Sequence, residues 1–133
     1  PPQLIKSYLE GEFTNLASCS VFPDFDRDQH YTDAEPTDRD TIYVGCDFNV
    51  GNCVTQHLIR KGEEFHFFNE AIYRDTQEMA SGLASLYPQH FKLNQLVLIP
   101  DAASKQRSTA AAQESDLGIL KKYGHRVMVQ STS

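Results

Sequence analysis

The segment Thr41-Ile-Tyr-Val-Gly-Cys-Asp47 starts the most regular residue pattern in the chain. Apolar residues occupy every second position, so Ile42, Val44 and Cys46 are predicted to share one face of a β-strand. Before residue 40 no stretch has the pattern of an independent core, and only residues 2–10 read as a short helix. The sequence therefore predicts that the folded domain begins near residue 41.

Two further strands and a helix are predicted after this segment. Residues 53–59 and 64–73 read as strands, and the sequence Lys61-Gly62-Glu63 between them is typical of a hairpin turn. Residues 76–87 then change to helical spacing, and Pro88 is predicted to end that helix. This part of the chain is expected to form a three-stranded meander followed by a crossover helix.

The last third of the chain alternates strand and helix. Residues 95–101 are apolar at both alternating positions, which is typical of a strand covered on both faces. A second helix is predicted near 114–123, stopped by Gly124, and a final strand over 125–130. The predicted order is β-β-β-α-β-α-β, an α/β fold with a ribonuclease-H-like mixed β-sheet flanked by helices.

Composition and charge exclude several classes of protein. The 133 residues suit one domain, and no apolar run approaches the roughly 18 residues of a membrane span. The net charge is −6, but residues 24–40 alone carry −5, so the remainder is nearly neutral. This charge argues against a whole-surface nucleic-acid binder but is compatible with a local basic face. Three cysteines without a CxxC spacing argue against a disulfide framework and a zinc ribbon.

Two carboxylates stand at predicted strand ends. Asp47 ends the first strand, and Asp101 ends the apolar strand over 95–100. Reacting groups of open α/β sheets collect at the carboxyl ends of strands. If these two strands are parallel neighbours, both carboxylates face one crevice, and a divalent cation would relieve their repulsion. Oxygen-only ligands of this kind suit Mg²⁺ or Mn²⁺.

Each candidate also has a purely structural interpretation. An aspartate at a strand end is commonly a turn former or a helix cap. Glu70, near the end of the third strand, is a further candidate metal ligand or simply a solvated edge residue. The loop 104–107 (Ser-Lys-Gln-Arg) is either a phosphate-holding loop or an ordinary soluble loop. These alternatives stay open on the sequence alone.

Four segments resemble a known family, the large terminase subunit of tailed bacteriophages. They are Tyr8-Leu-Glu-Gly-Glu-Phe13, Ile42-Tyr-Val-Gly-Cys-Asp-Phe-Asn-Val-Gly51, Ile99-Pro-Asp-Ala-Ala-Ser104 and Glu114-Ser-Asp-Leu-Gly-Ile-Leu120, the last followed by Lys-Lys-Tyr-Gly. The resemblance covers nearly the whole chain. It implies that residues 1–40 are a linker and acidic connection after the packaging ATPase, and that 41–133 are the ribonuclease-H-like nuclease domain, incomplete at its C-terminus.

The resemblance implies a metal-dependent endonuclease. Such an enzyme cuts concatemeric viral double-stranded DNA into genome lengths with a two-metal Mg²⁺ or Mn²⁺ site. The first and second catalytic acids of the family map onto Asp47 and Asp101, with Glu70 as an additional candidate ligand. The third acid is expected after the last strand and has no match before Ser133.

The resemblance also implies partners. Double-stranded DNA would be held by its phosphates, and Lys105, Arg107, Lys121 and Lys122 are the candidate DNA contacts. In the full protein the expected partners are the packaging ATPase domain, the small terminase subunit and the portal, with no membrane, in the host cytoplasm. Two alternatives remain: another ribonuclease-H-like nuclease of the resolvase or transposase type, or a catalytically inactive docking module.

Overall fold

The computed structural model describes residues 21–101 and 115–129, in two compact units that comprise residues 1–31 and 32–133. The described part of the first unit is built from turns, and the rings of Phe25 and His30 stack there with centroids 5.5 Å apart. The helix predicted over 2–10 lies outside the described residues.

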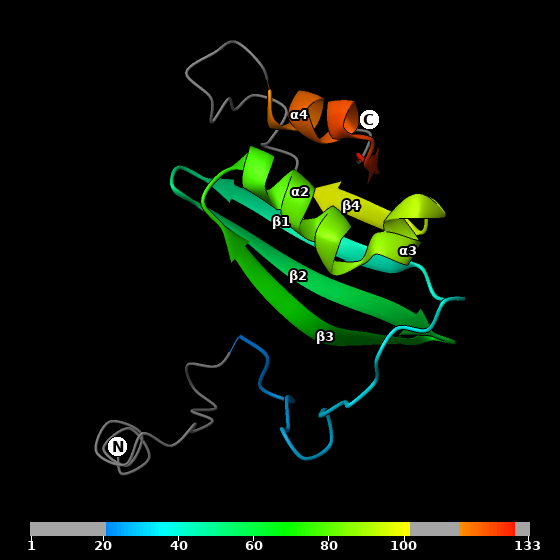
Figure 1. The fold of residues 1–133 in the computed structure, drawn as a ribbon. Helices are drawn as coiled ribbons and strands as arrows, with labels where there is room; N and C mark the ends of the chain where they lie inside the picture. The colour runs from blue at the N-terminus through cyan, green and yellow to red at the C-terminus, as the bar shows by residue number, and fades with distance from the viewer. Residues whose placement is uncertain (1–20, 102–114, 130–133) are drawn as a thin grey trace. The chain divides into compact units, whose positions relative to one another are not determined.

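The second unit is built on a five-stranded mixed sheet (Figure 1). Its strands span Ile42–Asn49 (β1), Asn52–Lys61 (β2), Glu64–Tyr73 (β3), Leu96–Pro100 (β4) and Arg126–Val127 (β5). They lie in the order β3-β2-β1-β4-β5. β1, β2 and β3 pair antiparallel, whereas β4 pairs parallel with both β1 and β5. The first and fourth strands are therefore parallel neighbours, as the candidate site requires.

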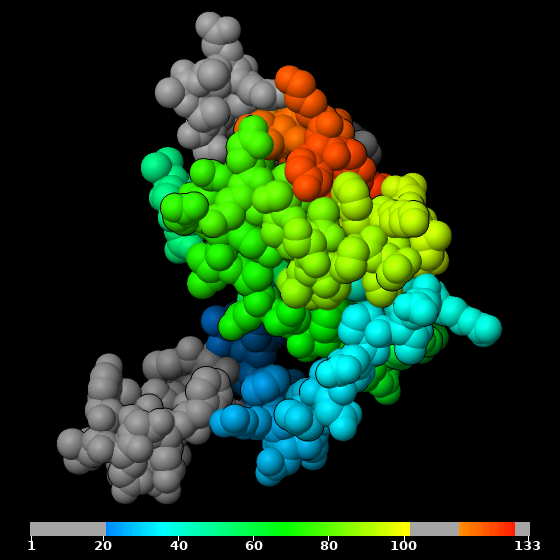
Figure 2. Space-filling model, viewed as in Figure 1, coloured from blue at the N-terminus to red at the C-terminus, as the bar shows by residue number. Residues whose placement is uncertain are grey.

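Three helices in the described part of the chain cover one face of this sheet. They are Thr76–Leu86 (α2), Pro88–Lys92 (α3) and Asp116–Tyr123 (α4) (Figure 1). Figure 2 shows their side chains closing over that face. We call it the helix-covered face, and we call the opposite face, on which the described residues place no helix, the open face. None of the described helices is long and apolar enough to cross a membrane.

The core lies between the sheet and the helices. Ile42, Val44, Cys46 and Phe48 of β1 are at most 4% exposed, while the residues between them are more accessible. Burial of alternate residues confirms the face that the sequence predicted. The apolar side chains that meet β1 come from the neighbouring strands and from the helices: Cys53, Ile59, Met79, Leu83, Leu96, Leu98 and Leu120. The result is the predicted α/β, ribonuclease-H-like mixed sheet with flanking helices.

The element boundaries follow from capping residues. The Asp75 carboxylate accepts a hydrogen bond from the Glu78 backbone N–H at 2.8 Å and so caps the start of α2. Gly124 ends α4 with a φ of +113°, a left-handed conformation that glycine adopts without steric cost, as predicted. α3 was not predicted. Pro88 does end α2, but it also occupies the first position of α3, where its missing N–H is tolerated.

Residues 32–40 form hydrogen bonds and an ion pair with the strands and with α3. The Thr32 hydroxyl lies 2.7 Å from Nδ1 of His66, and His90 Nε2 donates to the Thr37 carbonyl at 2.9 Å. Lys61 Nζ contacts both carboxylate oxygens of Asp40 at 2.8 and 2.9 Å. The division of the chain at residue 40 stays a prediction, and within the second unit these nine residues already pack against the sheet.

Candidate functional site

The two predicted carboxylates lie level with each other on adjacent strands. The parallel register pairs Gly45 with Ile99 and Cys46 with Pro100, and the Asp101 backbone N–H donates to the Cys46 carbonyl at 3.2 Å. One step further along this register, Asp47 stands opposite Asp101. Neighbouring strands lie about 4.8 Å apart, so the register brings these two residues to adjacent positions at the same end of the sheet.

Both carboxylates belong to the open face. Side chains alternate along a strand, and Cys46, which precedes Asp47, is buried on the helix-covered face. Pro100 is buried as well, and Asp101 after it is exposed. Two exposed acids at the carboxyl ends of parallel strands form a small, solvent-accessible negative site.

Neighbouring residues of β1 shape the surroundings of Asp47. Asn49 stands two residues further on the same face, and its side-chain Nδ2 donates to Asp47 Oδ2 at 3.2 Å. This hydrogen bond restrains the carboxylate and leaves its second oxygen for another ligand. Gly45 stands two residues earlier, and among the described residues a Cβ there would meet only the Gln56 carbonyl, at 4.0 Å. Because Gly45 has no side chain, nothing projects from this position of β1 beside Asp47.

The structure does not bring Glu70 to this pair. Glu70 lies on β3, where its register partner is Gln56, and Gln56 Nε2 donates to Glu70 Oε2 at 3.1 Å. Its side chain is on the open face but two strands from β1 and level with Gly45. Among residues 21–101 and 115–129, no group of three or more histidine, cysteine, aspartate or glutamate side chains is arranged to hold a metal ion.

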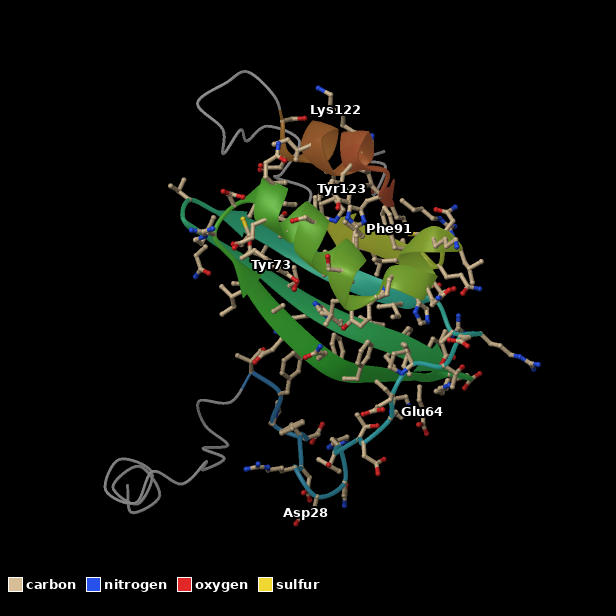
Figure 3. All side chains as sticks on the ribbon, in the orientation of Figure 1. Asp28, Glu64, Tyr73, Phe91, Lys122 and Tyr123 are labelled. Atoms are coloured by element: carbon tan, nitrogen blue, oxygen red, sulfur yellow. The ribbon has the colours of Figure 1, made fainter. Side chains whose placement is uncertain are left out.

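The predicted DNA contacts fall in two places. Lys105 and Arg107 lie outside the described residues. Lys121 and Lys122 are in the last turn of α4, which connects the parallel strands β4 and β5. A crossover helix runs antiparallel to the strands it connects, so these lysines lie at the sheet end away from Asp47 and Asp101. Figure 3 shows Lys122 on the outer side of α4.

A buried polar chain on the helix-covered face was missed by the sequence interpretation. The Thr55 hydroxyl donates to the Ala71 carbonyl at 2.9 Å and therefore accepts from Nε2 of His57, 2.8 Å away. Nδ1 of His57 is then the acceptor for the Tyr87 hydroxyl, which in turn accepts from Asn69 Nδ2 at 3.2 Å. Burial lowers the pKa of His57 to about 4, so this imidazole is neutral at pH 7.

The cysteines behave as apolar core residues. Cys46 and Cys53 are free and buried. Burial raises the pKa of the Cys46 thiol to about 12, and burial likewise raises the pKa of Cys53. A thiol that stays protonated is a poor nucleophile and a poor metal ligand. Both cysteines are therefore structural residues of the core.

A second buried polar contact joins two helices. The Thr76 hydroxyl at the start of α2 donates to Asp116 Oδ1 at the start of α4, with a distance of 2.7 Å. Both side chains are fully buried. Because the N-terminal ends of helices carry partial positive charge, the Asp116 carboxylate is favourably placed between them. This contact joins α4 to α2 beside the carboxyl end of the sheet.

Comparisons with known proteins identify the fold. No family model matches the chain, and no curated protein sequence matches it. Among solved structures, the large terminase from a thermophilic bacteriophage, in complex with ADP, matches with a TM-score of 0.62 and 17% identity. That match covers 82% of this chain and 27% of the terminase chain.

Other crystal structures of the same terminase agree. One without a named ligand has a TM-score of 0.61 at 17% identity and covers 83% of this chain and 27% of that chain. One in complex with ATP-gamma-S has a TM-score of 0.59 at 15% identity and covers 97% of this chain and 35% of that chain. The chain thus spans about a third or less of the terminases it matches, and its α/β, ribonuclease-H-like sheet is the fold of that part of a phage large terminase.

Proposed function

We propose that this chain is the metal-dependent endonuclease domain of a phage terminase large subunit, which cuts concatemeric viral double-stranded DNA during genome packaging. The observation that carries the proposal is the pair Asp47 and Asp101, level on adjacent parallel strands and exposed on the open face. The likeness of fold to phage large terminases supports the same proposal.

The chemistry of the pair fits a hard divalent cation. Mg²⁺ and Mn²⁺ prefer oxygen ligands, keep several waters, and are commonly held by one or two carboxylates together with substrate phosphates. Asp47 and Asp101 supply such a ligand set, and the neutral, buried His57 on the other face is no part of it. When bound, divalent ions supply an activated water and neutralise the charge that develops on the phosphate.

The protein groups contribute position and charge. Asn49 restrains one oxygen of Asp47 through its 3.2 Å hydrogen bond, so the carboxylate is oriented before a ligand arrives. Gly45 leaves the adjacent surface free of a side chain, which allows a phosphodiester to approach the backbone closely. The two acids together would hold the cation at the carboxyl end of the sheet.

The wider context is part of the proposal. The substrate is double-stranded DNA, and in the full protein the partners are the packaging ATPase domain, the small subunit and the portal, in the host cytoplasm. Glu70, Lys105, Arg107, Lys121 and Lys122 remain candidates. Of the candidate ligands, Glu70 is the weaker, since its carboxylate is already bonded to Gln56.

Nicking of supercoiled plasmid in millimolar Mn²⁺ tests the proposal. Wild-type chain should nick the plasmid, EDTA should stop the reaction, and Asp47→Asn and Asp101→Asn should each lower the rate at least about a hundredfold, since removing a metal ligand removes the activated water. Asp33→Asn is the matched control, because Asp33 is an exposed aspartate away from the pair. It should cleave like wild type.

Other outcomes separate the alternatives. Preference for a four-way junction over plasmid would favour a resolvase-type nuclease of the same fold. Equal rates in wild type and both site variants would refute the carboxylate site. No cleavage together with no Mn²⁺ binding would leave the inactive docking module.

A further inference from the structure

A second site lies on the open face at the other end of the sheet. A hollow of about 240 Å³ is found there, and its lining residues come from the start of β1, the end of β2 and the segments beside them: Arg39, Asp40, Thr41, Tyr43, Arg60 and Gly62. Tyr43 lies on the same side of β1 as Asp47, since the two are separated by an even number of residues. The hollow and the carboxylate pair therefore lie on the same side of β1.

The hollow carries positive charge in an acidic chain. Arg39 and Arg60 are both exposed, and no described residue forms an ion pair with either of them. The one acid among the described lining residues, Asp40, is neutralised by Lys61, which contacts both of its carboxylate oxygens. The hydrogen bond from Lys61 is also the largest cause that lowers the pKa of Asp40. Two guanidinium charges remain to attract an anion.

Arg60 is held in place before any ligand binds. Its Nε donates to the Gly62 carbonyl at 2.7 Å, and its guanidinium carbon lies 5.9 Å from the centre of the Phe65 ring. Gly62 has a φ of +64° in the β2–β3 turn, which directs the chain back beside the arginine. Restraint of the side chain lowers the entropy lost when the remaining guanidinium N–H groups bind a phosphate.

One DNA duplex can span the distance between the hollow and the carboxylate pair. Thr41 directly precedes β1, and Asp47 is six residues further along, which corresponds to about 20 Å at about 3.3 Å per residue. About 20 Å along the axis of B-DNA is about six base pairs. A duplex lying along β1 with one phosphate at Asp47 and Asp101 therefore brings a second backbone phosphate to the arginine hollow.

We propose that the hollow formed by Arg39 and Arg60 binds a backbone phosphate of duplex DNA and anchors the substrate about 20 Å from the cleavage site. The proposal rests on the proposed nuclease function. It replaces Lys121 and Lys122, at the end of α4, as the leading DNA contacts in the described part of the chain. It also explains how a chain with a net charge of −6 can bind a polyanion. The positive charge is concentrated in the hollow, where the Arg60 side chain is already held in place.

Binding of a fluorescein-labelled 20-base-pair duplex to the full chain, followed by anisotropy in Ca²⁺ over a range of KCl concentrations, tests the anchor. Arg39→Ala/Arg60→Ala should weaken binding at least about tenfold at 100 mM KCl and reduce the salt slope by about 0.9, as expected for one lost phosphate contact. The matched control is Arg74→Ala/Lys92→Ala, which removes the same charge from two exposed positions that do not line the hollow. It should change the slope little.

The outcomes distinguish this proposal from the nuclease proposal. An unchanged slope in the Arg39→Ala/Arg60→Ala variant, an equal loss in the control, or no duplex binding by wild type would overturn the anchor. Asp47→Asn should lose cleavage, and adding Arg39→Ala/Arg60→Ala to it should lower duplex affinity by the same factor as in wild type. If wild type binds through the arginines but never cleaves, the nuclease proposal fails and the phosphate site stands. Circular dichroism of each variant checks that the fold is retained.

Discussion

The two faces of the sheet have opposite chemistry. The helix-covered face is mainly apolar. Three of its buried polar side chains, Thr55, His57 and Tyr87, are linked to one another by hydrogen bonds. The open face carries exposed charge at both ends, with the carboxylates at one and the arginine hollow at the other. The same five strands supply both faces, because successive side chains point in opposite directions.

This difference separates titratable groups that stabilise the fold from those available to a ligand. A buried histidine whose two ring nitrogens are both bonded has nothing left to offer a substrate, whereas exposed carboxylates at strand ends do. Large apolar residues are present on the open face too: Phe65 and Phe67 of β3 are 63% and 59% exposed. The two faces therefore differ in the solvent exposure of their side chains and not in residue type alone.

The largest effect on stability is expected from the helix-covered face. Leu98 on β4 is fully buried, so Leu98→Ala should lower the free energy of unfolding by about 2–5 kcal/mol through lost burial and a residual cavity. Ile72→Ala on the open face, where the side chain is 67% exposed, should cost less than about 1 kcal/mol. Urea unfolding of both variants measures the contrast. Equal losses would mean that the open face is covered in solution.

The next effect is a dependence of stability on pH that arises from His57. Its pKa is lowered in the folded state to about 4, against 6.5 for the free group, so the unfolded state binds more protons between these values. The free energy of unfolding is therefore unaffected by His57 titration above about pH 6.5. It falls by up to about 1.4 kcal/mol per pH unit as the pH drops toward 4. His125, whose pKa is also lowered by burial, adds to the same trend.

Variants of two histidines isolate this contribution. Urea unfolding at pH 7 and pH 5 should show a smaller pH dependence in His57→Gln than in wild type, although the variant is less stable at both. His30→Gln, which changes an exposed histidine of the first unit, should keep the wild-type dependence. A His57→Gln variant with an undiminished pH dependence would show that His57 is not the titrating group.

A smaller effect is expected where α2 touches the sheet. A Cβ on Gly82 would come within 2.3 Å of the Tyr73 ring, so Gly82→Ala forces the ring to move, at a cost of about 1–3 kcal/mol. Alanine in a helix gains about 1 kcal/mol over glycine, which only partly offsets that cost. Gly82→Ala should therefore destabilise wild type but stabilise a Tyr73→Ala background. Thermal unfolding of the four proteins gives the sign in each background.

Much of the fold follows from local pattern. Alternation around Val44 and the doubly apolar strand containing Leu98 predicted the central strands, and their parallel pairing was the condition on which Asp47 and Asp101 would meet. α3 was missed because five residues are too few for a helical period to show. The metal-binding role of the two acids remains a proposal, while the adjacency of their strand ends is confirmed.

The remaining features depend on contacts between distant residues. His57 and Tyr87 are 30 positions apart, and nothing in either segment indicates that they bond. The arginine hollow forms only because the segment before β1 packs beside the turn after β2, which brings Arg39 to Arg60. Local pattern cannot report such pairings, because they are fixed by the tertiary packing of the whole unit.

Calorimetric titration of the full chain with Mn²⁺ tests the central claim most directly, because it measures the carboxylate site without requiring catalysis. Wild type should bind Mn²⁺, and Asp47→Asn and Asp101→Asn should each weaken binding at least about tenfold, as the loss of a charged ligand requires. Glu70→Gln should weaken binding less than either of these variants, and Asp33→Asn should bind like wild type. Wild-type affinity in both Asp47→Asn and Asp101→Asn, or no binding by wild type, would contradict the account.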